Sequence, residues 1–253
     1  MVRRRTAAAE IAVHTVGEVV EDAGEYVRRQ VAAVIRRLPG RYSSARVKLA
    51  VLGRASAPCP ALAQVNVEID GWPVRVQVAA AFLREAAGLL RVRLGQQVAR
   101  LAMPWAPRPW PDSGPRRARP QPLRPVGRSE IVRQKTVSLV RCAPDEAALT
   151  MDLMDFDVHL FVDADTGEDS VVYRVGPTGY RLARLKSLAP PAGSMRLPLT
   201  VNVHPVPELS AEQAAEQLAR TEYSFLFFRD ADAGRGHVLY QRYDGHYGLV
   251  VAG

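Results

Sequence analysis

The sequence predicts an α+β protein with an N-terminal β-α-β-β-β-α domain followed by two tandem small β-α-β-β-β domains. Three observations lead to this class: strands that alternate apolar and polar residues, helices with an apolar stripe, and a repeated segment. Val158–Leu182 recurs as Phe225–Leu249 at a gapless offset of 67, which places Asp163 on Asp230. That offset is too long for a solenoid repeat and indicates two duplicated domains.

The first 103 residues predict one domain in which two helices cover a four-stranded sheet. Alternation predicts the strands, and Asp70-Gly71 marks a tight hairpin between the last two. A stripe of period 3.6 predicts each helix, and Pro39-Gly40 ends the first one. In chain order the predicted elements are strand Ile11–Val20, helix Glu21–Leu38, strands Arg46–Arg54, Leu62–Ile69 and Val74–Ala80, and helix Phe82–Met103.

A linker of 25 residues, Pro104–Arg128, follows the first domain. It contains eight prolines and six arginines, so it cannot build a core and is predicted to be extended. Trp105 and Trp110 in this linker fit two alternative interpretations, stacking on RNA bases or packing against a domain surface, and the sequence does not decide between them. The predicted domains are 1–103, 129–185 and 199–253, joined by linkers 104–128 and 186–198.

Each duplicated domain is predicted to begin with a strand and a helix before its three-stranded meander. The leading strands are Glu130–Val140 and Leu199–Val206. Pro144 opens the first helix, and Ser210 begins a capping-box sequence before the second. Each unit therefore has one helix available to cover one face of its sheet.

Positive charge is concentrated in the first half of the chain, although the net charge is +8 overall. Residues 1–103 hold 16 basic and 8 acidic residues, the linker 6 and 1, and residues 129–253 hold 12 and 17. This split predicts a polyanionic partner for the first half alone. Arginines lie on an arc away from the apolar stripe of the first helix and flank the stripe of the second, and arginine neutralises phosphates and stacks on unpaired bases. The predicted RNA-binding residues are Arg28, Arg29, Arg36, Arg37, Lys48, Arg84, Arg91, Arg93, Arg100, Arg116, Arg117 and Arg119.

The second duplicated domain contains four consecutive apolar residues, Phe225–Phe228, so both faces of that strand are apolar. A domain of about 55 residues cannot bury both faces of its sheet alone. The sister domain is the nearest partner, and the 13-residue linker 186–198 favours pairing within the chain through local concentration. The predicted pairing residues are Phe161, Tyr173, Phe225, Phe227, Phe228 and Tyr240.

No pattern of catalytic or metal-binding residues is found in the sequence. The five histidines are scattered, and Cys59 and Cys142 lie outside any ligand spacing, as expected of cytosolic thiols. Asp163 and Asp165 could suggest a calcium loop, but the twelfth position from Asp163 is Arg174, so a turn is the simpler interpretation. No apolar run approaches the roughly 20 residues that cross a bilayer. We expect no enzyme activity, no cofactor, no metal, no membrane association and no small-molecule substrate.

The repeated region resembles the C-terminal domain of long-form ribosome hibernation-promoting factors, also called sigma-54 modulation proteins. The resemblance covers residues 130–185 well and 199–253 less well, because the second copy lacks the Ile-Val-Arg-x-Lys opening. The N-terminal region is similar to the ribosome-binding domain of that family in element order. The matching residues are Ile131-Val132-Arg133, Lys135, Glu146-Ala147, Met151, Phe161, Asp165, Gly167, Val172-Tyr173-Arg174 and Asp244–Leu249.

The resemblance implies a cytoplasmic, ribosome-associated factor whose N-terminal domain binds small-subunit rRNA, blocks the mRNA/tRNA path and silences translation in dormancy or stress. Family members usually carry one C-terminal domain, which pairs between molecules and joins two ribosomes. Because this chain carries two, we expect them to pair with each other, so that single ribosomes are held idle. The alternatives are pairing between chains, which joins two ribosomes, and a protein-binding regulator of transcription or stress.

Overall fold

The computed structural model describes residues 11–37, 42–51, 59–102, 129–176, 179–242 and 244–253. The chain divides into two compact units, one holding residues 11–102 and the other most of residues 129–253. No helix in these ranges is long and apolar enough to span a bilayer. Arg116, Arg117, Arg119, Trp105 and Trp110 lie outside the described residues.

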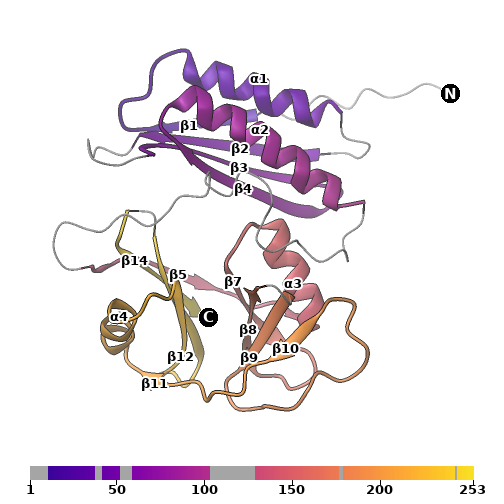
Figure 1. The fold of residues 1–253 in the computed structure, drawn as a ribbon, viewed down its shortest axis with the longest axis vertical. Helices are drawn as coiled ribbons and strands as arrows, with labels where there is room; N and C mark the ends of the chain where they lie inside the picture. The colour runs from indigo at the N-terminus through magenta and orange to yellow at the C-terminus, as the bar shows by residue number, and fades with distance from the viewer. Residues whose placement is uncertain (1–10, 38–41, 52–58, 103–128, 177–178, 243) are drawn as a thin grey trace. The chain divides into compact units, whose positions relative to one another are not determined.

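The N-terminal unit is a four-stranded sheet with α1 and α2 side by side on one face (Figure 1). The strand order is β1-β2-β3-β4, with β1 parallel to β2 and the other pairs antiparallel. This confirms the predicted element order. The elements are β1 (Ile11–Val16), α1 (Ala23–Ile35), β2 (Tyr42–Val51), β3 (Ala61–Ile69), β4 (Trp72–Ala80) and α2 (Leu83–Arg100).

The core of this unit lies between the helices and the sheet, because the predicted apolar stripes face inward. Val27 and Val31 of α1 and Leu90 and Leu94 of α2 are fully buried. The first strand is shorter than predicted and ends at Val16 rather than Val20. Gly17 takes a positive φ of 79°, and a side chain there would meet the carbonyl oxygen of Val51 at 2.6 Å. Glycine is therefore required where the strand ends.

The C-terminal unit contains two five-stranded sheets, each built around one copy of the predicted three-stranded meander. The first sheet has the order β10-β9-β8-β7-β6 and the second β11-β12-β13-β14-β5. The elements of the first copy are β5 (Ile131–Val137), β6 (Arg141–Cys142), α3 (Pro144–Leu153), β7 (Val158–Asp163), β8 (Asp169–Val175) and β9 (Gly179–Arg184). Those of the second are β10 (Leu199–Val201), β11 (Glu208–Leu209), α4 (Ala211–Ala219), β12 (Phe225–Asp230), β13 (Gly236–Gln241) and β14 (Tyr247–Ala252).

The two copies exchange their leading strands, whereas the sequence pattern predicts that each strand stays in its own copy. Strand β5 pairs in parallel with β14 of the second copy, and β10 pairs in parallel with β9 of the first. Only residues 138–140 separate β5 from β6, although these strands lie in different sheets. The predicted ranges 129–185 and 199–253 therefore describe the repeat in sequence, whereas each sheet takes one strand from the other repeat.

Each sheet of this unit is apolar on both faces. One face of the first sheet packs against α3 around Phe161, and one face of the second packs against α4 around Phe228. A third cluster joins the remaining faces of the two sheets, with Leu160 and Val171 from the first and Phe227 and Val238 from the second. We call this third cluster the shared core.

His159 is expected to make the stability of the first sheet depend on pH in the acidic range. It lies in β7, stacked between the rings of Phe156 and Phe161 at centroid distances of 6.4 Å to each. Burial lowers its pKa from 6.5 to about 4. Between those values the unfolded chain binds a proton that the folded chain does not bind, so stability is lost as the pH falls from 6.5 towards 4.

We predict that His159→Gln flattens the loss of stability between pH 6.5 and pH 4. The group should account for at most about 3 kcal/mol over that interval. Urea unfolding of both proteins at several pH values checks this, with the C-terminal unit followed by its aromatic signals. Identical pH profiles for the two proteins would contradict the assignment.

Candidate functional site

Four arginines on the two helices of the N-terminal unit project into solvent. Arg29, Arg36 and Arg37 lie on or just after α1, and Arg91 lies on α2. All four are exposed, and within the described residues none of them forms an ion pair. A guanidinium without a carboxylate partner is available to a phosphate at little cost.

Two of these arginines line one groove between α1 and α2. The groove has a volume of about 630 Å³ and is lined by Arg37 and Arg91, by one acidic residue, Asp70, and by apolar side chains such as Val34 and Val98. Cationic groups beside an apolar surface can hold a phosphate and a stacked base together. This groove and the four exposed arginines form what we call the arginine face.

Two further predicted arginines form ion pairs with acidic residues of the same unit. Arg84 forms an ion pair with Asp22 at 2.6 Å and lies over the ring of Tyr26 at 5.4 Å. Arg28 pairs with Glu25 one turn earlier. Both pairs are exposed, and such pairs contribute at most about 1 kcal/mol, so a polyanion could compete for either guanidinium.

The remaining predicted cations of the described region are less accessible. Lys48 in β2 and Arg100 at the end of α2 are half-buried. Arg93 is buried, and its guanidinium donates to the backbone carbonyl oxygen of Gln77 in β4 at 3.4 Å. The helical arc from which Arg93 and Arg100 were predicted does not distinguish such inward positions from the exposed ones.

The six aromatic residues predicted for pairing are divided between the two faces of their sheets. Tyr173, Phe225 and Phe227 belong to the shared core, with Tyr173 and Phe225 in edge-to-face contact at 5.3 Å. Phe161 and Phe228 lie on the opposite faces, against the helices. The side chains of successive strand residues point to opposite faces, which separates Phe227 from Phe228. Tyr240 covers Gly248, where an added side chain would collide with its ring.

Beside the shared core lies a polar contact that the sequence analysis missed. The Oδ2 of Asp169 accepts from the Nε of Arg235 at 2.7 Å and from the N–H of Gly236 at 2.8 Å, and its Oδ1 accepts from Nη2 of Arg235 at 3.1 Å. Burial alone would raise the pKa of Asp169, but these donors hold it below its usual value. The sequence does contain a signal of this contact, because the offset of 67 aligns Asp169 of the first copy with Gly236 of the second, and the two residue types differ.

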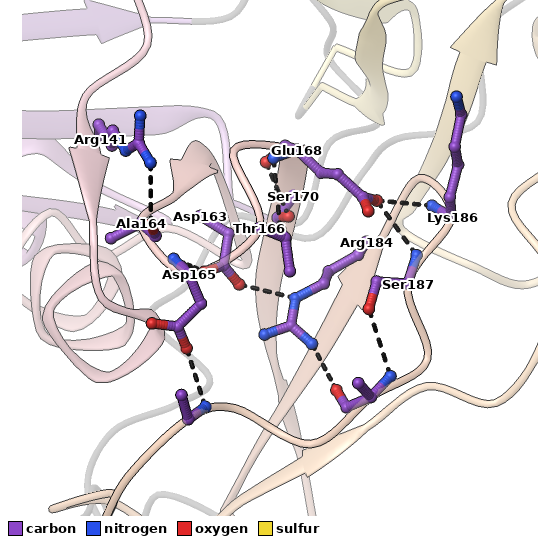
Figure 2. A network of polar contacts seen from close by, with 12 residues as sticks. Arg141, Asp163, Ala164, Asp165, Thr166, Glu168, Ser170, Arg184, Lys186 and Ser187 are labelled. Atoms are coloured by element: carbon purple, nitrogen blue, oxygen red, sulfur yellow. Dashed lines mark hydrogen bonds and ion pairs between the residues drawn. The ribbon is translucent and has the colours of Figure 1, made fainter.

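The acidic turn after β7 uses its carboxylates within the protein (Figure 2). Asp163 accepts from the backbone N–H of Asp165 at 2.9 Å and from the buried Arg184 at 2.7 Å. Asp165 accepts from the N–H of Ala192, and Glu168 accepts from the N–H groups of the loop that follows β9. Turn formation and one buried ion pair thus account for these acids, and no cluster able to hold a metal occurs among the described residues.

Comparisons with known proteins agree with the duplicated architecture. The family model described as "Sigma 54 modulation/S30EA ribosomal protein C terminus" matches twice, at residues 127–182 and 200–249. The "Dormancy associated translation inhibitor" of Mycobacterium tuberculosis, matched in strains CDC 1551 and H37Rv, is 40% identical over 249 residues, which are 96% of this chain and 88% of that protein.

Two solved structures are similar to about a third of the chain. The N-terminal domain of Protein Y from Thermus thermophilus is 26% identical, with a TM-score of 0.29, and covers 36% of this chain and 98% of its own. A ribosomal subunit interface protein from Coxiella burnetii is 16% identical, also with a TM-score of 0.29, and covers 37% of this chain and 97% of its own.

We predict that Phe227→Ala lowers the free energy of unfolding of the C-terminal unit by about 3–5 kcal/mol. Phe227 is 7% exposed in the shared core, so its removal leaves a cavity between the two sheets. Tyr223→Ala is the matched control, because this aromatic residue is 68% exposed and should change stability by less than about 0.5 kcal/mol. Urea unfolding measures both, and equal effects would contradict the role of the shared core.

Proposed function

This chain belongs to the sigma 54 modulation/S30EA ribosomal protein family, and we propose that it is a ribosome-associated translation inhibitor linked to dormancy. Support comes from the relative of Mycobacterium tuberculosis, which aligns with nearly the whole chain. The family is not one of enzymes, which confirms the expectation that this chain is not an enzyme.

Within that function, the N-terminal unit binds small-subunit rRNA and blocks the path of mRNA and tRNA. The observation that carries this proposal is the arginine face, with four exposed arginines that form no ion pair within the described residues. The surplus of basic over acidic residues in the first half of the chain adds a long-range attraction for RNA. Arg28 and Arg84 can join the contact by releasing their exposed acidic partners.

The C-terminal copies pair with each other within one chain, so that the factor holds single ribosomes idle. The exchanged strands support this, because β5 and β10 each hydrogen-bond to the sheet of the other copy. The shared core supports it as well, because it fills the face of each sheet that its own helix leaves uncovered. Within the described residues, the sheet faces that could pair with a second ribosome-bound chain already pack against each other in the shared core.

We predict that the variant Arg29→Gln, Arg36→Gln, Arg37→Gln and Arg91→Gln binds ribosomes at least about tenfold more weakly than the natural chain. Each lost phosphate contact should also reduce the slope of log affinity against log salt by about 0.7. Co-sedimentation with vacant ribosomes at several salt concentrations measures both quantities.

A control variant removes the same amount of charge from exposed positions of the C-terminal unit, with Arg133, Lys135, Lys186 and Arg220 each changed to Gln. It should bind ribosomes with nearly the affinity and salt slope of the natural chain. If the two variants lose affinity equally, binding depends only on total charge, and the arginine face is not the site.

A further inference from the structure

The two copies of the repeat differ at a point where equivalent residues touch. Asp169 and Gly236 occupy the same position of the repeat, because the offset between the copies is 67 residues. They are also in contact, because the Oδ2 of Asp169 accepts from the N–H of Gly236 at 2.8 Å. The exchange of β5 and β10 between the copies is reciprocal, so an approximate twofold axis relates them, and a contact between equivalent residues lies on this axis.

At this axis the first copy supplies only acceptors and the second only donors. The carboxylate of Asp169 receives two hydrogen bonds from Arg235 and one from the backbone of Gly236. The equivalent of Arg235 in the first copy is Glu168, whose carboxylate accepts from the backbone N–H groups of Lys186 and Ser187 (Figure 2). The contact is therefore asymmetric although the repeat is symmetric.

The packing at this contact is asymmetric as well, because only the first copy places a side chain there. A side chain added at Gly236 would place its Cβ 2.8 Å from the Cβ of Asp169 and 2.9 Å from the ring of Phe227. The space at the axis holds one side chain, and the first copy fills it. Asp169 itself is only 6% exposed, so water does not replace a lost donor there.

The apolar part of the interface cannot discriminate between the copies. Its residues come in equivalent pairs at the offset of 67, such as Leu160 with Phe227 and Val171 with Val238. Both members of each pair are apolar, so two first copies, two second copies or one of each would all bury apolar surface. The polar contact on the axis is therefore what distinguishes a first copy from a second copy as the pairing partner.

We propose that Asp169, Arg235 and Gly236 form a lock that makes the first copy accept a second copy and reject another first copy. Two first copies would bring two Asp169 carboxylates together in a space for one side chain, without a donor. Two second copies would leave a gap between two glycines and two arginines without an acceptor. The lock rests on the proposed pairing of the copies, and it directs the C-terminal unit away from identical copies on other ribosome-bound chains.

The direct test uses two full-length variants, alone and mixed. Gly236→Asp gives its chain an aspartate on the axis in both copies, and Asp169→Gly gives its chain a glycine in both. Neither variant has the lock within its own chain. Mixing them brings the Asp169 of one chain and the Arg235 and Gly236 of the other together, which restores the lock across two chains.

We expect each variant alone to have the mass of one chain in light scattering and the mixture to form a species of two chains. Hydrogen exchange in β8 and β13 should be faster in each variant alone and slow again in the mixture. A mixture that gains no mass overturns the proposal, and so does a Gly236→Asp chain with the exchange rates of the natural protein.

A milder pair of substitutions tests the lock even if Gly236→Asp fails to fold. Asp169→Asn should raise the opening rate of these strands about tenfold or more, and Arg235→Gln should add little in its presence, because both remove one contact. The control pair, Glu208→Gln and Arg229→Gln, removes an exposed ion pair of 3.0 Å within the second sheet and should have little effect. Additive effects of Asp169→Asn and Arg235→Gln would overturn the lock.

These experiments use the free protein, so a failure of ribosome binding does not affect them. A natural chain that is already a dimer in solution would contradict pairing within the chain. The lock would then still be tested by the hydrogen exchange of the variants.

Discussion

The C-terminal half of this protein depends on one constraint, the burial of a second apolar face on each small sheet. Helices α3 and α4 each cover one face, around Phe161 and Phe228. The other faces, which include Leu160 and Phe227, would expose a large apolar surface if left uncovered. The shared core fills these faces, and the exchange of β5 and β10 adds backbone hydrogen bonds between the two copies.

The meanders and their turns could be predicted from the sequence because their determinants are local. Alternation defines β7 to β9 and β12 to β14, and the carboxylates of Asp163 and Asp230 close equivalent turns by accepting from the backbone N–H groups of Asp165 and Asp232. The strand exchange could not be predicted in this way. Alternation in β5 shows which side chains share a face but not which edge the strand joins, and β6 and β11 are two residues long, too short for any period.

The candidate RNA-binding surface was predicted in outline, and the structure adds what a helical wheel lacks. A wheel places Arg84 and Arg91 on the same helix but contains no information about the neighbouring helix. Contacts across α1 and α2 pair Arg84 with Asp22, whereas Arg37 and Arg91 lie along one groove. The polar contact at Asp169 could not be predicted from the positions that the two copies share. Its trace in the sequence is a difference between them, with Asp169 in the first copy at the position of Gly236 in the second.

The central claim is that one chain satisfies its own pairing surface and so holds one ribosome rather than two. Sucrose-gradient sedimentation of vacant ribosomes saturated with the full chain tests it most directly. The account predicts that the protein travels with single ribosomes and that no heavier peak forms as its concentration rises. A heavier peak of joined ribosomes, lost when the chain is truncated after Arg128, would contradict it and would show that the copies reach across molecules.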